Sequence, residues 1–222
     1  MFAVIFVVQP KKERWEKYLA LAKRLKPKLE AIDGYIANER FKGLGDDSKL
    51  LSLSIWRDEK SVIRWRTHSE HHDVQKKGRF EVFEDYHLRV GEIVSDSDQP
   101  PGIADQRRFD GTEIGAAKAV TITELTAVDG STTTVAVLAG DLGLERDIKD
   151  LIEQETYESI YTPGKFALLA YWRSAQAAQQ WQPRASQALR ALRHRQVRVI
   201  RDYGMFDRRE APQFYADVRR KG

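Results

Sequence analysis

The chain has 222 residues, of which 41% are hydrophobic and 32% are charged, so it can bury an ordinary core and is not disordered throughout. Its formal net charge is only +4, from 37 basic and 33 acidic residues spread along the chain, which argues against a nucleic-acid-binding protein. The absence of cysteine excludes disulfides, thiolate metal sites and a cysteine nucleophile, and it fits a cytoplasmic protein.

The longest apolar run, residues 2–8, is shorter than the roughly 20 residues that a membrane-spanning helix needs. It also lacks the basic segment and cleavage site of a signal peptide. We therefore expect a buried strand at this position and no contact with a membrane.

The first half of the chain predicts strands and helices in the order β-α-β-β-α-β. Apolar residues at three- and four-residue spacing predict the first helix, the turn at residues 33–34 ends it, and Asp58 is placed to cap the second helix. The predicted strands are 2–8, 35–41, 50–56 and 87–94, and the predicted helices are 13–29, 59–65 and a more polar stretch at 69–83.

Residues 95–115 predict a linker, because they contain Pro-Pro-Gly and many aspartate and arginine residues. After the linker the order of elements repeats. The predicted strands are 119–126, 157–161, 165–172 and 197–206, the predicted helices are 144–155, 174–181 and 184–192, residues 130–134 form a polar turn, and residues 135–139 are either a strand or the start of a helix.

A repeated pattern of tryptophan residues indicates an internal duplication. The triplets at 55–57 and 171–173 each contain Trp-Arg after a large apolar residue and lie 116 positions apart, and Trp65 and Trp181 have the same offset. A period of this length indicates a duplicated domain rather than a solenoid repeat. We therefore divide the chain into a first domain, a linker, a diverged second domain and a C-terminal tail, at residues 1–94, 95–115, 116–208 and 209–222.

This order of elements is typical of a ferredoxin-like α+β module, whose antiparallel sheet carries helices on one face only. The other face must be covered, and the second copy can cover it. We expect two modules packed sheet to sheet as an α+β barrel. The barrel would be a pseudo-dimer within one chain or, if domains are exchanged between chains, a homodimer. The space between each sheet and its helices is the expected ligand pocket.

Three histidines lie close together in the first half: His68, His71 and His72. His68 and His72 are four residues apart and so share a helix face, as in some metal sites. No recognisable third ligand accompanies them, and solvent-exposed histidines near a helix start are the simpler interpretation, so we expect no metal site.

Other candidate residues have both a structural and a functional interpretation. Trp56 and Trp65 either pack in the core or line a pocket, and Arg57 either binds a substrate carboxylate or pairs with a neighbouring acidic residue. Gln9 and Asn38 are polar residues beside predicted strands, where they can reach a pocket. No Ser-His-Asp spacing, phosphate-binding loop or dinucleotide motif is present.

Several segments of the first half resemble the antibiotic biosynthesis monooxygenase family, in particular its small bacterial single-domain members. The resemblance covers nearly all of residues 1–94, and the second half resembles the same fold more weakly. It implies a ferredoxin-like α+β barrel. The segments that carry it are 36–41, 50–58, Trp65, 71–79 and 83–90.

The resemblance also implies two kinds of chemistry. Some members of the family oxidise polycyclic phenols with molecular oxygen and no cofactor, and others bind and degrade haem. The haem site of that branch has an asparagine on the first strand, a helix tryptophan and a histidine ten residues later. In this chain Trp65 matches, but Gln75 stands at the histidine position and Gln9 at the asparagine position. We therefore expect no cofactor.

The resulting hypothesis is a monooxygenase that oxidises a small aromatic or polycyclic substrate with oxygen, without metal or flavin. The alternatives are a haem-binding or haem-degrading protein and a non-catalytic small-molecule-binding module. The site is expected in the first half only, because the second half contains a single histidine, His194. The expected catalytic residues are Trp65, His71, His68 and Tyr86, and the expected substrate-binding residues are Gln9, Asn38, Trp56, Arg57, His72 and Gln75.

Overall fold

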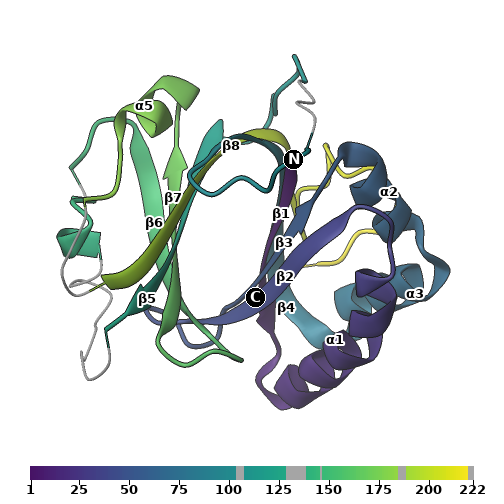
Figure 1. Cartoon of the computed structure of the whole chain (residues 1–222). Helices are drawn as coiled ribbons and strands as arrows, with labels where there is room; N and C mark the ends of the chain where they lie inside the picture. The colour runs from purple at the N-terminus through teal and green to yellow at the C-terminus, as the bar shows by residue number, and fades with distance from the viewer. Residues whose placement is uncertain (104–107, 129–138, 146, 185–188, 220–222) are drawn as a thin grey trace.

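The strands of the chain close into a single barrel, as a computed structural model shows for residues 1–103, 108–128, 139–145, 147–184 and 189–219 (Figure 1). In these ranges the barrel has the strand order β1-β3-β2-β6-β7-β5-β8-β4. The strands are β1 (Phe2–Pro10), β2 (Tyr35–Gly43), β3 (Leu50–Trp56), β4 (Phe83–Asp96), β5 (Ala119–Ala127), β6 (Leu151–Ser159), β7 (Lys165–Trp172) and β8 (Leu189–Gly204).

Two antiparallel seams join the halves of the barrel. Strand β2 pairs with β6 over a short stretch in which Phe41 lies opposite Ser159. Strand β4 pairs with β8 over a longer stretch, which begins where His87 lies opposite Gly204. Each half contributes four neighbouring strands, in the orders β4-β1-β3-β2 and β8-β5-β7-β6. The prediction of two ferredoxin-like modules forming one α+β barrel is therefore confirmed.

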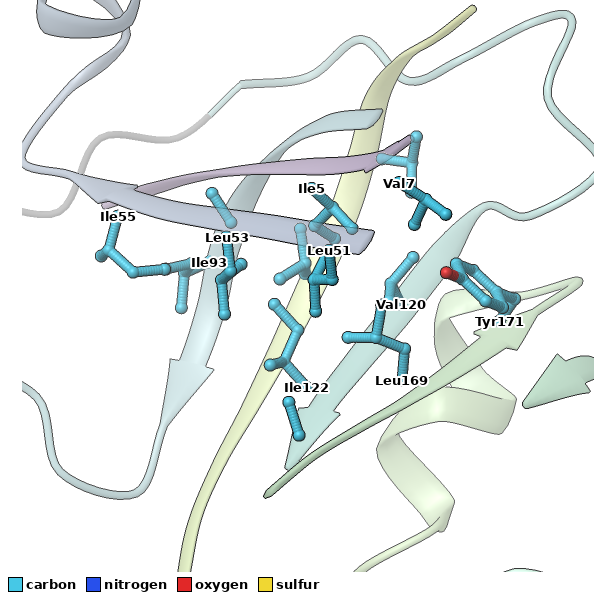
Figure 2. Packing of buried hydrophobic residues seen from close by; sticks show 14 of the residues in the cluster. Ile5, Val7, Leu51, Leu53, Ile55, Ile93, Val120, Ile122, Leu169 and Tyr171 are labelled. Carbon is cyan, nitrogen blue, oxygen red and sulfur yellow. The ribbon is translucent and has the colours of Figure 1, made fainter. Parts of the chain in front are cut away.

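Successive side chains of each strand point alternately into the barrel and toward its outer face. In β3, Leu51, Leu53 and Ile55 point into the barrel, where Figure 2 shows Leu51 near Val120 and Ile122 of the second half and Ile55 beside Ile93. Because neighbouring residues of a strand point to opposite faces, Ser52, Ser54 and Trp56 lie on the outer face. The middle of the barrel is thus filled with apolar side chains, as in other small barrels.

Three helices cover the outer face of the first half (Figure 1). These helices are α1 (Trp15–Glu30), α2 (Glu59–Thr67) and α3 (Ser69–Lys77), and a π-turn, η2 (Gly78–Val82), follows α3. Asp58 caps α2 as predicted, because its carboxylate accepts a hydrogen bond of 2.8 Å from the backbone N–H of Ser61. The second half has the short helix α5 (Ala175–Gln180), which Ser174 caps. No helix in the described part of the chain is long and apolar enough to cross a membrane.

Two of the helix predictions for the second half are wrong. Residues 151–155 of the helix predicted at 144–155 belong to β6, and Asp150 has a positive φ of 67° directly before that strand begins. Residues 189–192 belong to β8, where Leu192 pairs with Leu125 of β5. In both places pairing with a neighbouring strand outweighs a composition that favours helix. Residues 130–134, 135–138 and 185–188 lie outside the described residues.

The duplicated tryptophans occupy matching places in the two halves. Trp56 and Trp172 each end a central strand, and their indole N–H groups donate to Ser54 Oγ (2.9 Å) and Thr121 Oγ1 (3.1 Å). The helix tryptophans differ, because Trp181 packs on Trp172 with ring centroids 6.1 Å apart in a buried apolar cluster. In the described part of the second half, core side chains therefore fill the space beside Trp181.

Candidate active site

A cavity of about 210 Å³ lies between the first-half sheet and its helices. Most of its wall is apolar and comes from α1, α2 and the outer face of β1 and β4. The cavity forms where it does because β1 and β4 place every second side chain on this face. The principal apolar residues are Val4, Phe6, Leu21, Leu25, Leu29, Val62, Ile63, Val74, Leu88 and Val90.

Five of the residues expected in the site line this cavity: Asn38, Trp65, His71, Gln75 and Tyr86. They come from β2, α2, α3 and β4, and packing of the helices on the sheet brings them together. The first half therefore collects polar groups around an apolar space, which is the usual composition of a small-molecule site.

Five other expected residues do not line this cavity. Trp56 is fully buried in the core, and Arg57 pairs on the surface with Asp33 at 2.8 Å. His68 precedes α3 without lining the cavity, and His72 is exposed and stacks on Tyr215. Gln9 lines a different, more polar cavity at the mouth of the barrel.

The cavity at the mouth of the barrel has a volume of about 470 Å³. Its charged groups are largely paired with one another: Asp202 binds both His87 and Arg89, and Lys49 pairs with Glu155 at 2.9 Å. These charges are therefore satisfied by one another and do not by themselves point to a ligand.

The imidazole of His71 stacks on the indole of Trp65, with ring centroids 4.0 Å apart and planes 13° apart. Its Nδ1 lies 2.9 Å from the backbone oxygen of Trp65. Because a carbonyl oxygen only accepts hydrogen bonds, we assign the proton to Nδ1. Gln75 Nε2 lies 3.2 Å from Nδ1 and 3.4 Å from Nε2 of the ring, and with Nδ1 protonated only Nε2 can accept a hydrogen bond.

Burial of the His71 ring lowers its pKa to about 4, although the bond to the Trp65 carbonyl acts in the opposite direction. The charges of the neighbouring histidines His68 and His72 lower it further. The ring is therefore neutral at physiological pH, with an acceptor nitrogen available to a substrate.

Acidification is expected to destabilise the protein through two neutral histidines. Burial lowers the pKa of His71 and of His194 from 6.5 to about 4, so the unfolded chain binds more protons than the folded chain below pH 6.5. Stability is complete above that pH and falls toward pH 4, by roughly 1–3 kcal/mol for each histidine. Urea unfolding from about pH 7.5 to about pH 4.5 measures this slope.

The matched comparison is between His194→Gln, which removes one buried group, and His72→Gln, which removes an exposed one. The first variant is expected to show a shallower loss of stability on acidification and the second an unchanged one. An equal loss of unfolding free energy on acidification in the unaltered protein and in both variants would contradict the assignment of the acid sensitivity to buried histidines.

A hydrogen-bonded row of side chains lies at the β2 and β3 part of the cavity. Arg40 Nη1 donates to Asn38 Oδ1 (3.1 Å), and Asn38 Nδ2 donates to Ser52 Oγ (3.2 Å) and to the backbone oxygen of Leu53 (3.0 Å). Asn38 is thus held in one orientation by both ends of its amide. Its position in the cavity wall is determined by the sheet.

The C-terminal tail, yellow in Figure 1, lies along the cavity beside α2. Arg79 in the π-turn is almost fully buried and donates to the backbone oxygens of Met205 (2.6 Å) and Ala216 (3.0 Å). Gln213 donates to the side-chain oxygen of Gln75 (3.1 Å). The tail predicted at residues 209–222 therefore forms part of the cavity wall over its described residues.

Sequence reasoning missed the arginine and tyrosine residues that line this part of the cavity. They come from β2, α2, the π-turn, β8 and the C-terminal segment after β8, and most of them belong to the half in which no site was expected. The residues are Arg40, Arg66, Arg79, Arg201, Tyr203, Arg208 and Tyr215. The only available signal was the arginine-rich composition around residues 190–201. Among the described residues, no group of three or more His, Asp or Glu side chains could hold a metal ion.

Comparison with known proteins gives one close sequence relative. The family model described as antibiotic biosynthesis monooxygenase matches residues 1–77. A protein of Pyricularia oryzae (strain 70-15) named jasmonate monooxygenase ABM is 42% identical over 221 residues, which cover 97% of this chain and 98% of that protein.

Solved structures share the fold at much lower identity. An aldoxime dehydratase in complex with butyraldoxime has a TM-score of 0.58 and 11% identity over 90% of this chain and 79% of its own. A second aldoxime dehydratase structure has a TM-score of 0.55 and 12% identity, over 89% of this chain and 80% of its own. At these identities the likeness concerns the fold alone.

Proposed function

The chain belongs to the antibiotic biosynthesis monooxygenase family, and from this premise we propose that it oxidises a small, largely apolar cyclic molecule in the cavity beside Trp65 and His71. The observation that carries the proposal is the composition of that cavity. Apolar side chains form most of its wall, and its hydrogen-bonding groups include the neutral His71 and the amides of Asn38 and Gln75. Such a site orients a substrate through few polar contacts.

The size of the cavity favours a compact substrate. About 210 Å³ is at the small end for ligand pockets, so one ring with short substituents fits better than an extended polycyclic molecule. The relative from Pyricularia oryzae is named for jasmonate. We therefore place a jasmonate-like compound first and the aromatic or polycyclic phenols of the sequence-based hypothesis second.

The proposed reaction uses molecular oxygen without metal or flavin. Oxidation of a CH₂ group to a carbonyl by one O₂ releases one water, and the substrate itself supplies all the electrons. Hydroxylation of a C–H bond instead needs two electrons from an external donor. In the first case the protein has to hold the substrate, accept a proton and stabilise the resulting anion. His71 Nε2 is the acceptor that the cavity offers, and bound negative charge beside the ring would raise its pKa.

Haem is a poor fit to the same residues. The His71 ring is stacked on Trp65, and its Nδ1 is bound to a backbone carbonyl. Gln75, at the position where haem-degrading relatives have a histidine, bonds to the tail residue Gln213. A haem macrocycle is also larger than a cavity of about 210 Å³. Haem therefore has no part in the proposed reaction.

Oxygen consumption tests the proposed function. The purified, metal-analysed protein is incubated with jasmonate or with a panel of electron-rich quinols, each with and without NADPH as a two-electron donor. Mass spectrometry after labelling with ¹⁸O₂ is expected to show one labelled oxygen atom in the product. No turnover of any of these compounds, or a Soret band and activity that appear only after haem is added, would contradict the proposal.

A further inference from the structure

Half-buried and buried arginines outside the cavity are usually paired with carboxylates. Arg89 pairs with Asp202 at 3.0 Å, Arg195 with Asp96 at 3.0 Å, and Arg198 with Glu92 at 2.6 Å. This is the usual way in which a folded protein accommodates buried positive charge.

Five arginines of the cavity break this pattern. Among the described residues, none of them forms an ion pair with an aspartate or glutamate. Arg40 donates to Asn38. The other four come from α2, the π-turn, β8 and the segment that follows β8, and we call them the arginine cluster: Arg66, Arg79, Arg201 and Arg208. The cavity lining contains one acidic residue, Glu59, which pairs with Arg108 of the linker. The cavity therefore carries a clear excess of positive charge.

Three members of the arginine cluster, Arg66, Arg201 and Arg208, lie near the buried side chain of Tyr203. Burial and the nearby Tyr86 raise the pKa of Tyr203 to about 12, and the charges of Arg208, Arg66 and Arg201 act against that rise. Arg208 also lies over the Tyr203 ring, 5.6 Å from its centroid. Guanidinium groups from three separate segments therefore converge on the same part of the cavity.

The four guanidinium groups of the arginine cluster differ in the hydrogen bonds that they already form. Arg79 and Arg208 donate to backbone oxygens and to the Tyr86 hydroxyl, so they hold the tail and the wall in place. The side chains of Arg66 and Arg201 donate no hydrogen bond to any of the described residues, and Arg66 Nε is buried without a partner. A buried donor left unpaired is a feature that calls for a missing acceptor.

We infer that Arg66 and Arg201 bind the carboxylate of an amphipathic substrate, whose apolar body lies against Phe6, Leu25 and Val62. A guanidinium offers two parallel N–H donors to the two oxygens of a carboxylate, which makes it the best-matched side chain for this group. The apolar majority of the lining favours a carboxylic acid with a cyclic or aliphatic body over a highly charged phosphate. This inference rests on the proposed function, because it names the substrate class of the same cavity.

Binding in the absence of oxygen tests the inference without requiring turnover. Titration calorimetry compares jasmonate with its uncharged methyl ester, and decanoate with methyl decanoate, on the full chain. We expect each acid to bind at least about 10-fold more tightly than its ester, as charge-assisted hydrogen bonds require. In Arg66→Gln and Arg201→Gln the acids should lose about 10-fold in affinity or more while the esters change little.

Arg173→Gln is the matched control, since it removes the same charge from an exposed position in the second half. Its affinities should equal those of the unaltered chain, and thermal unfolding checks that all variants are folded. Equal binding of acid and ester, equal losses for both ligands, or no binding of either acid would overturn the inference. Selective binding of an acid with no oxidation of any compound would instead support the arginine site and contradict the monooxygenase proposal.

Discussion

Replacement of His71 by alanine is expected to lower kcat by about 100-fold or more, as loss of a positioned proton acceptor does. The ring is stacked on Trp65 and its protonated Nδ1 is held by the Trp65 carbonyl, so only Nε2 is left to accept a proton from the substrate. Substrate affinity should change much less, because the apolar wall and the arginine cluster remain. Steady-state oxygen uptake with the active substrate separates the two parameters.

His72→Ala is the matched control for this prediction. His72 is exposed on the same helix and contacts the tail through Tyr215 rather than lining the cavity. Its kcat is expected to stay within about 3-fold of the original value, as for a surface substitution. A comparable loss in both variants, or a loss confined to KM in His71→Ala, would contradict a role for His71 in proton transfer.

Replacement of Arg79 by glutamine is expected to lower the free energy of unfolding by about 3 kcal/mol and to release the tail. Arg79 is 2% exposed, and its side chain joins the π-turn to the carbonyl of Met205, directly after β8, and to that of Ala216 in the tail, 126 and 137 residues further along the chain. Without the guanidinium, the buried carbonyl of Met205 and the partly buried one of Ala216 lose their donor. Urea unfolding measures the loss of stability, and limited proteolysis followed by mass spectrometry measures the release of residues 205–219.

Arg24→Gln provides the comparison, because Arg24 forms an exposed ion pair with Glu70 on the helical surface. Exposed pairs contribute little, so this variant should lose less than about 1 kcal/mol and keep its tail protected. Unchanged stability and an unchanged digestion pattern in Arg79→Gln would show that other contacts hold the tail.

The parts of the fold that local sequence determines were predictable. Strand β3 was expected at residues 50–56 and is found there. Apolar and polar side chains alternate along it, and Asp58, which caps the next helix, follows closely after its last residue. Residues 189–192 were expected to be the end of a helix and are strand, since pairing with β5 decides their conformation. No property of the segment itself contains that information.

The same distinction applies to the candidate site. Asn38, Trp65, His71, Gln75 and Tyr86 lie within one module, where the order of elements places them around a single pocket. The cluster members from β8 and the segment that follows β8 reach that pocket only because the barrel closes between β4 and β8. Contacts over such distances along the chain follow from the tertiary fold, so spacing within the sequence does not reveal them.

Closure of the barrel by two halves of one chain also removes a constraint that symmetry imposes. In a dimer of identical subunits, every substitution is copied at both equivalent positions. Here Trp181 packs into a buried core in one half, while Trp65 lines a cavity in the other. The second half could therefore give up its own pocket and contribute a strand and a tail to its neighbour. One barrel would then turn over one substrate molecule at a time, with each half evolving under a different selective demand.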